Sequence, residues 1–299
     1  MAVPPQLNEI WAIWREISGH ANHLVPLNLY AAPGALRDGI RTIFLDGSNH
    51  WEMLRVLDIG ELPVPEASVH LVVIESESGP SGSELAFIRR LPPNEILLLL
   101  PDIPPAALGA RRREVAAIVG TRLERVVATS TSSELRDALI ARLLQIFELH
   151  AVALARQFPA LRAEATQQEI ARTSQQNAMV GLIPVPGADM PVMTINQIKM
   201  VMRLAAMHDQ PMTHERLKEV LAVLGGGYAL RTAARQLAKF IPGPGWLISG
   251  GMGYAGTLAM GRAALEYFKR SSAGHSGITT LGDDGRPIID TKATVIKTE

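Results

Sequence analysis

The residues best suited to chemistry follow the first buried strand that the sequence predicts. The turn after this strand, Ala31 to Asp38, reads Ala-Ala-Pro-Gly-Ala-Leu-Arg-Asp. A phosphate-binding loop at such a turn needs Gly for close backbone approach, Lys for the terminal phosphates and Ser or Thr for magnesium. Leu36, Arg37 and Asp38 occupy those three places. Because the Asp38 carboxylate would repel phosphate, we expect no phosphoryl transfer at this turn.

A second alignment of the same turn keeps the glycine spacing, from Gly34 to Gly39. Ile40 and Arg41 follow, so the Lys and the hydroxyl group are missing here as well. Catalysis of phosphoryl transfer depends almost wholly on positioning and electrostatic stabilisation, which these groups supply. Gly34 and Arg37, with Arg37 in place of Lys, therefore remain candidates for nucleotide binding alone.

Short apolar runs surround this turn and alternate with segments of helical periodicity. The pattern predicts an α/β fold with a mostly parallel, doubly wound sheet and helices on both faces. Helices are expected at residues 83–91, 106–119 and 132–149, the last with Ser132 or Ser133 as its N-cap. The expected strands are residues 27–31, 42–45, 53–57, 69–74, 96–100 and 125–128.

In order and spacing, residues 25–150 resemble an Era-like GTPase domain, and the resemblance implies a GTPase-like fold. The family's Asp-x-x-Gly turn is matched by Leu57-Asp-Ile-Gly60 with one residue missing, which makes Asp58 a third nucleotide-binding candidate. The guanine-reading Asn-Lys-x-Asp motif is replaced by Pro101-Asp-Ile-Pro104. The resemblance therefore implies a degenerate domain, or pseudo-GTPase. The alternative is an ordinary doubly wound domain without GTPase ancestry, and neither is expected to be an enzyme.

Charge nearly disappears in two segments of the second half. After a polar-faced helix expected at residues 149–175, no charged residue lies at 173–188, and none lies at 240–261. The second segment has 22 residues, which approaches a membrane span. Pro242 and Pro244 bar a regular helix at its start and leave about 17 residues, or roughly 25 Å, against a hydrocarbon core of about 30 Å. We therefore expect a marginal, tilted or hairpin insertion.

Small residues recur every four positions in the same segment, at Ser249, Gly253, Thr257 and Gly261. Such a stripe permits close contact between helices, so another helix should lie against it. The expected partner is the other apolar segment, because Ile-Pro-Val-Pro-Gly at 183–187 and Ile-Pro-Gly-Pro-Gly at 241–245 form a short repeat. The further residues assigned to membrane contact or helix packing are Pro184, Pro186, Gly187, Asp189, Pro242, Pro244, Gly245 and Trp246.

Asp189 has a structural explanation and a functional one. Its carboxylate is well placed to cap a helix that has Pro191 in its first turn and runs to about His208. An acid beside a membrane segment could instead be functional, but we favour the cap. Further helices are expected at residues 211–224 and 228–239, so the helical module should have four or five helices.

The second half resembles a known family over roughly residues 165–270. The resemblance is to the bacterial GTPase-associated membrane domain of unknown function that YcjF-type membrane proteins share. It is carried by Gly-Leu-Ile-Pro-Val-Pro-Gly-Ala-Asp-Met-Pro at 181–191, Asn-Gln-Ile-Lys-Met-Val at 196–201, Leu-Arg-Thr-Ala-Ala-Arg-Gln-Leu-Ala-Lys at 230–239 and Ile-Pro-Gly-Pro-Gly-Trp at 241–246. It implies membrane association behind an Era-like domain and supplies no reaction.

Composition limits the partners and the compartment. Lys plus Arg and Asp plus Glu both number 29, so no net charge favours nucleic acid as a partner. The chain has no cysteine and no ligand-spaced histidine cluster, so no metal or cofactor is expected and a reducing compartment fits. The N-terminus has no pattern of a secretory signal. We expect a location at the membrane, facing the cytoplasm.

These observations predict a degenerate GTPase-like α/β domain at residues 1–150, a helical membrane-associated domain at 151–270 and a polar tail at 271–299. The expected function is that of a non-catalytic, membrane-associated scaffold or regulatory protein, whose partners are membrane lipid and either another protein or a second copy. The alternatives are a nucleotide-responsive, GTP-binding membrane switch and a soluble helical bundle that oligomerises through the small-residue stripe.

Overall fold

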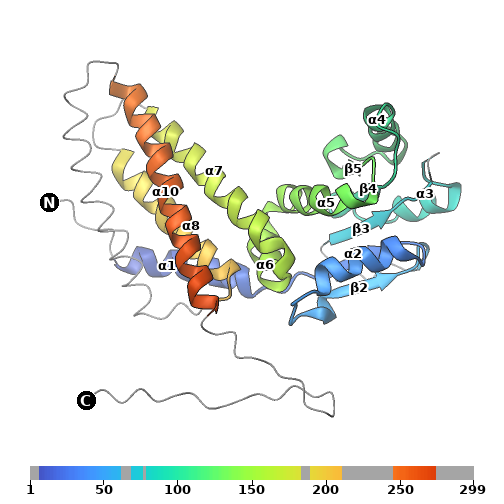
Figure 1. Cartoon of the computed structure of the whole chain (residues 1–299), viewed down its shortest axis with the longest axis horizontal. Helices are drawn as coiled ribbons and strands as arrows, with labels where there is room; N and C mark the ends of the chain where they lie inside the picture. The colour runs from blue at the N-terminus through green and yellow to red at the C-terminus, as the bar shows by residue number, and fades with distance from the viewer. Residues whose placement is uncertain (1–6, 62–68, 77–78, 183–188, 211–244, 274–299) are drawn as a thin grey trace, which may run out of the picture.

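The structure is a computed structural model that describes residues 7–61, 69–76, 79–182, 189–210 and 245–273 (Figure 1). A sheet with its helices forms one part of the molecule, and long helices form the other (Figure 1). The fold is therefore α/β followed by all-α, as the sequence predicts.

The sheet has five strands, all parallel, in the order β2-β1-β3-β4-β5. This is one of the common orders of doubly wound sheets. Every residue of β1, β3 and β4 is buried, as expected where helices cover both faces. The strands are β1 (Leu27–Tyr30), β2 (Leu54–Leu57), β3 (Val69–Val73), β4 (Ile96–Leu100) and β5 (Val126–Ala128).

Alternate strand residues face two separate cores, because side chains of a strand point to opposite faces in turn. Leu29 and Leu71 belong to the core on the side of α2 and α5. Tyr30 and Val72, the next residues along, belong to the core on the side of α3 and α4. The helices are α2 (Ala35–Leu45), α3 (Gly82–Ile88), α4 (Leu108–Val119) and α5 (Ser132–Ile146).

Two local predictions in this part are wrong. Residues 42–45 belong to α2 rather than to a strand, because Phe44 and the residue four positions before it are buried on one helical face. The N-cap of α5 is Thr131 rather than Ser132 or Ser133, since the Thr131 hydroxyl accepts a hydrogen bond from the backbone N–H three residues on, at 3.4 Å.

The continuous helix expected at residues 149–175 is also wrong. It is divided into α6 (Ala151–Gln157) and α7 (Arg162–Leu182), with a 3-10 turn at Pro159–Leu161 between them. Pro159 causes the break, because proline has no N–H to donate and disfavours the helical conformation of the residue before it. Phe158 accordingly has φ −119° and ψ 99°.

The break joins the helical part to the sheet. The Gln157 side chain, which is buried, binds both backbone groups of Val25, accepting from its N–H at 2.6 Å and donating to its carbonyl at 3.1 Å. The next residue, Phe158, packs edge-on against Phe44 of α2, with ring centroids 5.2 Å apart. One hydrophobic core therefore continues from the sheet into the helical part.

Three long helices lie side by side in the helical part (Figure 1): α7, α8 (Asp189–Met207) and α10 (Gly245–Ala273). The start of α8 at Asp189 confirms the predicted helix. The start of α10 directly after Pro244 agrees with the predicted effect of the two prolines, but the helix continues well beyond Gly261. The N-terminal helix α1 (Leu7–Asn22) packs against α8 and α6 rather than against the sheet.

The small-residue stripe of α10 lies against other helices, as predicted. A Cβ on Gly253 would come within 2.7 Å of the Asn177 carbonyl oxygen and 3.1 Å of Met193 Cε, and a Cβ on Gly261 within 2.7 Å of the Ile170 side chain. The main partner is α7, which carries Asn177 and Ile170. Asn177 belongs to the uncharged segment 173–188 that was expected as the partner, whereas its Ile-Pro-Val-Pro-Gly stretch at 183–187 lies outside the described residues. α8 is the second partner.

Parts of the two predicted membrane segments lie outside the described residues. Within the described ranges, no single helix is long and apolar enough to cross a membrane, whereas Ser132–Ile146 and Glu148–Gln157, which meet at 95°, reach that length and composition only as a bent pair. Gly245, Trp246 and Ser249 lie in the first turns of α10. The features outside the described residues are Pro184, Pro186, Gly187, Pro242, Pro244, the helices expected at 211–224 and 228–239, and the tail.

We expect alanine at Gly253 or Gly261 to destabilise the protein, because a Cβ at either position would lie 2.7 Å from an atom of α7. Overpacking of this kind costs about 1–3 kcal/mol. Gly251 is the matched control, since a Cβ there has nothing within 4 Å, and alanine should be neutral or add up to about 1 kcal/mol through helix propensity. Urea unfolding measures the three variants, and equal stability of Gly253→Ala and Gly251→Ala would contradict the close contact.

Candidate functional site

Of the three nucleotide-binding candidates, Gly34 and Arg37 follow β1 and Asp58 follows β2. They therefore lie at the carboxyl ends of two neighbouring parallel strands, the edge at which doubly wound sheets bind ligands. Arg37, in the first turn of α2, donates a hydrogen bond from Nη1 to Asp58 Oδ1 at 2.7 Å, in an ion pair. The guanidinium that would have to contact phosphate is thus bound by a carboxylate of the same chain. Gly34 precedes α2 in an extended conformation, and a Cβ there would meet nothing within 4 Å, so the backbone does not require glycine.

The loop that replaces the base-reading motif has a structural role. Asp102 follows β4 in a left-handed conformation, with φ 55°. Its Oδ2 accepts a hydrogen bond from Ser132 Oγ at the start of α5, at 2.7 Å. The carboxylate therefore joins a loop to a helix.

A cavity of about 440 Å³ lies where the two parts of the molecule meet, between α1, α5, α6, α7 and α8. Its size is within the range of small-molecule sites. Its wall combines apolar side chains with a group of ionisable ones, among them Glu16, His20, Glu148, Glu169, Arg172 and Arg203. Sequence reasoning did not identify this cavity, because its residues come from helices far apart in the chain.

Glu169 is the most buried ionisable residue of this cavity, with 7% of its surface exposed. Its carboxylate accepts hydrogen bonds from Arg172 Nη2 at 2.5 Å and from Arg203 Nη1 at 3.3 and 3.4 Å. Burial raises the pKa of Glu169, and the charge of Arg203 acts in the opposite direction. Arg172 also pairs with Glu148, at the end of α5. The cluster thus links the α/β part to α7 and α8, and the carboxylate is not free to act as a base.

A second polar group is buried between the three long helices. The Thr257 hydroxyl of α10 accepts hydrogen bonds from Asn177 of α7 and Gln197 of α8, both at 2.9 Å, and donates to the Gly253 carbonyl at 2.7 Å. Asn196 donates to the Asn177 side-chain oxygen at 2.9 Å. Buried polar groups are tolerated where their hydrogen bonds are made. Because these four side chains, the buried polar layer, meet only when the helices are aligned in this way, the layer favours one register of the helices. Of the residues in these contacts, the sequence pointed to Thr257 and Gly253 as packing residues.

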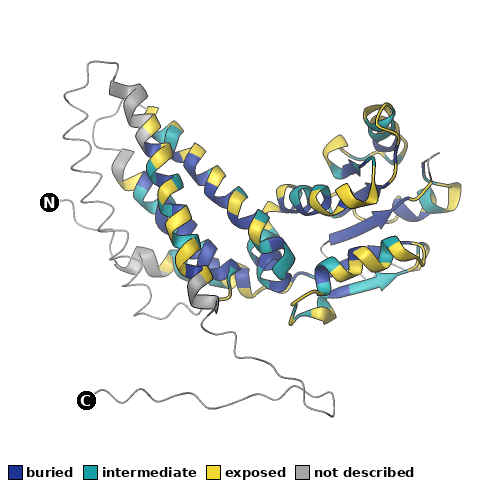
Figure 2. Cartoon of the chain, viewed as in Figure 1, coloured by how far each residue is buried: buried dark blue, intermediate teal, exposed yellow. Residues whose placement is uncertain are grey.

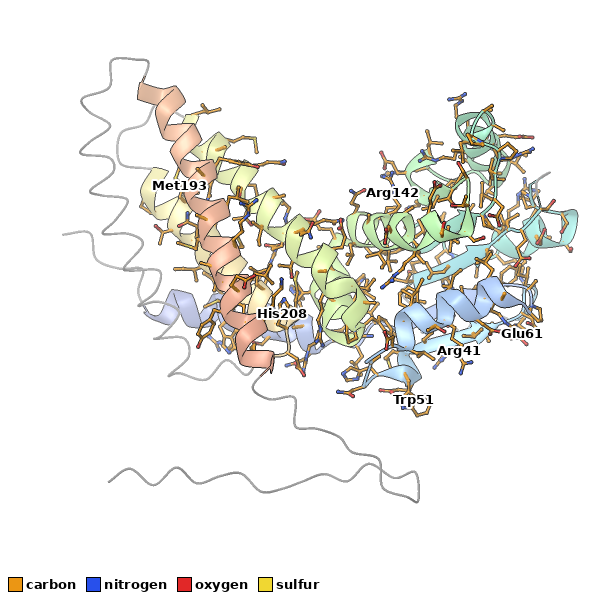
Figure 3. All side chains as sticks on the ribbon, in the orientation of Figure 1. Arg41, Trp51, Glu61, Arg142, Met193 and His208 are labelled. Carbon is orange, nitrogen blue, oxygen red and sulfur yellow. The ribbon has the colours of Figure 1, made fainter. Side chains whose placement is uncertain are left out.

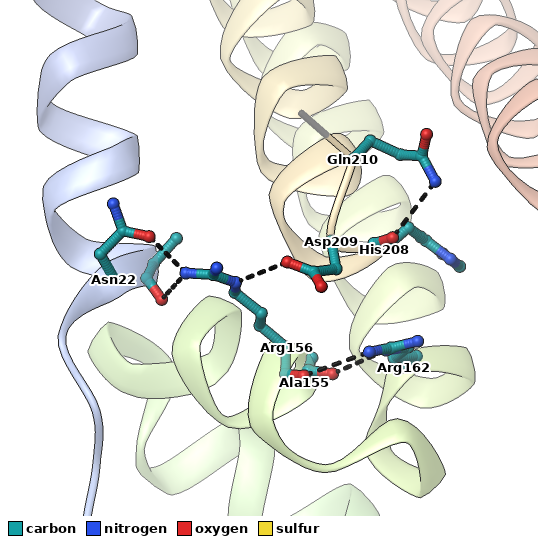
Figure 4. Close-up of polar contacts among 8 residues, drawn as sticks. Asn22, Ala155, Arg156, Arg162, His208, Asp209 and Gln210 are labelled. Atoms are coloured by element: carbon teal, nitrogen blue, oxygen red, sulfur yellow. Dashed lines mark hydrogen bonds and ion pairs between the residues drawn. The ribbon is translucent and has the colours of Figure 1, made fainter. Parts of the chain in front are cut away.

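Arg156 connects three helices at the opposite end of the helical part (Figure 4). From α6 it donates to Asp209 at 2.9 Å, just after α8, and it also binds the Ala21 carbonyl oxygen and the Asn22 side chain at the end of α1. Arg162 lies nearby and donates to two carbonyl oxygens at the end of α6 (Figure 4). These contacts explain why α1 belongs in space to the helical part.

In the α/β part, the polar residues Asn28, Tyr30 and His70 are buried on neighbouring strands. Asn28 donates to the Tyr30 hydroxyl at 3.1 Å, and His70 Nδ1 lies 3.5 Å from the same oxygen. Desolvation raises the pKa of Tyr30 and lowers that of His70. The group is closed off from solvent and gives the core a fixed polar contact. Among the residues that the structure describes, no three His, Asp or Glu side chains are arranged to hold a metal ion.

We expect Glu169→Ala to lower the free energy of unfolding by about 2 kcal/mol, because it leaves Arg203 without its carboxylate partner in a partly buried place. Glu114→Ala is the matched control: it removes an exposed partner from an ion pair of 2.8 Å with Arg111 and should cost about 0.5 kcal/mol or less. Chemical denaturation compares the two variants. A loss no larger for Glu169→Ala than for Glu114→Ala would show that the cluster does not hold the helices together.

Comparison with known proteins finds a family match for one region of the chain. No curated protein and no solved structure matches the sequence. The matched region begins near the end of α5, includes α6, α7, α8 and α10, and covers the residues of the buried polar layer and of the Glu169 cluster. Residues 144–284 match the family model described as a domain of unknown function, DUF697.

Proposed function

We propose that this chain is a non-catalytic, membrane-associated scaffold or regulatory protein. Its helical part attaches to the membrane on the cytoplasmic side, and its α/β part presents a surface to a protein partner. The observation that carries the proposal is a group of exposed apolar side chains at one end of the helical part. This distal end consists of the last turns of α7 and the first turns of α8 and α10, away from the sheet (Figure 1).

Four large apolar side chains are exposed at the distal end: Met179 by 60%, Leu182 by 42%, Val192 by 45% and Tyr254 by 39%. In Figure 2 the ribbon of these helices carries exposed residues, drawn in yellow, along the described part of this end. Apolar groups gathered on one surface mark an interaction site, whereas single ones need no explanation. No charged residue lies on α7 after Arg172 or on α10 before Arg262, and α8 carries one in this region, Asp189 at its first position. This low charge supports lipid as the partner of the surface, which also exposes the uncharged Gln175 and Gln176.

The α/β part supports a non-catalytic role. Arg37 and Asp58, which would have to act on phosphate and magnesium, form an ion pair with each other. The turn also has neither Lys nor Ser or Thr at the required positions. The order of strands and helices and the missing phosphate-binding residues support the further proposal of a pseudo-GTPase domain of Era-like ancestry, followed by a YcjF-type membrane module.

A nucleotide-responsive switch is the alternative that one observation favours. Arg37 lies in the first turn of the helix that follows β1, and helix N-termini at this place bind phosphate in doubly wound sheets. Titration with a fluorescent GTP analogue separates the two functions. Saturable binding that Arg37→Gln abolishes would favour the switch, and its absence favours the scaffold.

A homo-oligomer built through the small-residue stripe has less support. Gly253, Thr257 and Gly261 are already in contact with α7 and α8 of the same chain. A second copy would therefore have to bind another surface of the molecule.

We expect the purified chain to float with phospholipid vesicles, to stay bound in high salt and to be released by detergent. Leu182→Asp with Val192→Asp should weaken binding by more than about a thousandfold, since each carboxylate in hydrocarbon costs about 2.5–3.5 kcal/mol and about 1.4 kcal/mol is tenfold. Trp51→Asp is the control, because Trp51 is 69% exposed on the α/β part (Figure 3). A wild-type chain that stays in the aqueous fraction would contradict membrane association.

A further inference from the structure

The contacts between the three long helices place their residues at common heights. Gly253 of α10 lies beside Asn177 of α7 and Met193 of α8, and Gly261 lies beside Ile170. Arg203 of α8 contacts Glu169 of α7. These contacts show which residues of the three helices lie at the same height. They also show that α7 runs antiparallel to α8 and to α10. Met193 lies toward the distal end and His208 toward the opposite end (Figure 3).

At these heights the charges separate into two zones. The distal zone contains residues 173–182 of α7, 189–198 of α8 and 245–261 of α10, and its single charged residue is Asp189, at the first position of α8. From Arg172 to Leu182, α7 rises about 15 Å at 1.5 Å per residue. That height is about half the hydrocarbon thickness of a bilayer, which is about 30 Å. Between Asp189 at its tip and the charged residues below it, this uncharged zone thus has the depth of one leaflet.

A belt of basic residues lies directly below this zone. It contains Arg172 of α7, Lys199 and Arg203 of α8, and Arg262 of α10, at the height of Ile170 and Gly261. Two carboxylates, Glu148 and Glu169, lie in contact with members of the belt, so four cations face two anions. Arg15 and Glu16 of α1 add one charge of each sign nearby.

Lys199 and Arg262 carry the net charge of the belt. Arg172 and Arg203 are bound to Glu169, whereas Lys199 and Arg262 have no ion-pair partner within the part of the chain that the structure describes. Cations on flexible stems can reach lipid headgroups while the residues above them lie among acyl chains.

We propose that the distal end enters a single leaflet to the depth of its uncharged zone, and that Lys199 and Arg262 bind anionic phospholipid headgroups at the leaflet surface. This inference rests on the proposed membrane association and adds to it the inserted segments, the depth and the lipid class. The charge pattern selects lipid as the occupant: exposed apolar side chains at the tip, with the uncharged Gln175 and Gln176 exposed below them on α7, end at a positive belt that complements anionic headgroups. An apolar protein groove would need no such belt.

The depth is measured with single cysteines, which the chain permits because it has none of its own. Nitroxide labels on Met179→Cys, Lys199→Cys and Trp51→Cys report contact with oxygen in the acyl region or with a water-soluble nickel complex. On vesicles of phosphatidylcholine with phosphatidylglycerol, the label at 179 should lie in the acyl region, the label at 199 at the headgroups and the label at 51 in water. A chain that binds vesicles while the label at 179 stays in water overturns the insertion but not the membrane association.

The lipid class is measured by replacing the free cations. Lys199→Gln with Arg262→Gln should weaken binding to vesicles that contain phosphatidylglycerol by about 25-fold, because one basic residue near an anionic surface contributes about fivefold. Binding to pure phosphatidylcholine should not change. Arg90→Gln with Arg136→Gln, two exposed arginines of the α/β part, is the matched control. An equal loss in both double variants, or no loss in either, overturns the role of the belt, and failure of the wild-type chain to bind any vesicle overturns the proposed function as well.

Discussion

The close approach of α10 to α7 determines the arrangement of the helical part. Two glycines eight residues apart, Gly253 and Gly261, allow it, because a Cβ at either would lie 2.7 Å from α7. This approach brings the Thr257 hydroxyl within reach of Asn177 and Gln197. With the register fixed in this way, uncharged residues come together at one end and basic residues lie at one height below them.

The two parts of the molecule are held together by contacts on both sides of their junction. Pro159 ends α6, and the two residues just before it bind Val25, which precedes the first strand, and pack against Phe44 of α2. On the other side of the junction, Arg172 pairs with Glu148 after α5. The hydrophobic core continues across these contacts, so the helical part and the α/β part share one buried interior. Such a connection suits a scaffold that holds a binding domain at a fixed place on a surface.

The sequence predicted the α/β class, most of the strands and the small-residue contact, because these follow from periodicity within one segment. Residues 42–45 show the limit of that reasoning, since a threonine followed by three apolar residues fits a strand or one turn of a helix equally well. The break at Pro159 follows from a known property of proline and could have been predicted. The Arg37–Asp58 pair, the place of α1 and the cavity around Glu169 depend on residues far apart in the chain, and no local pattern encodes them.

The distribution of charge along the sequence suggested membrane contact. The register of the helices shows which uncharged residues lie together at one end of the helical part. Polar residues such as Asn177 and Gln197 lie inside the helical part, whereas Met179 and Leu182 are exposed at its distal end. Hydrogen–deuterium exchange of the unmodified chain, with and without anionic vesicles, tests this distribution most directly. The account predicts slower exchange at residues 173–182, 189–198 and 251–261 and unchanged exchange in the sheet. Slower exchange confined to the α/β part would contradict it.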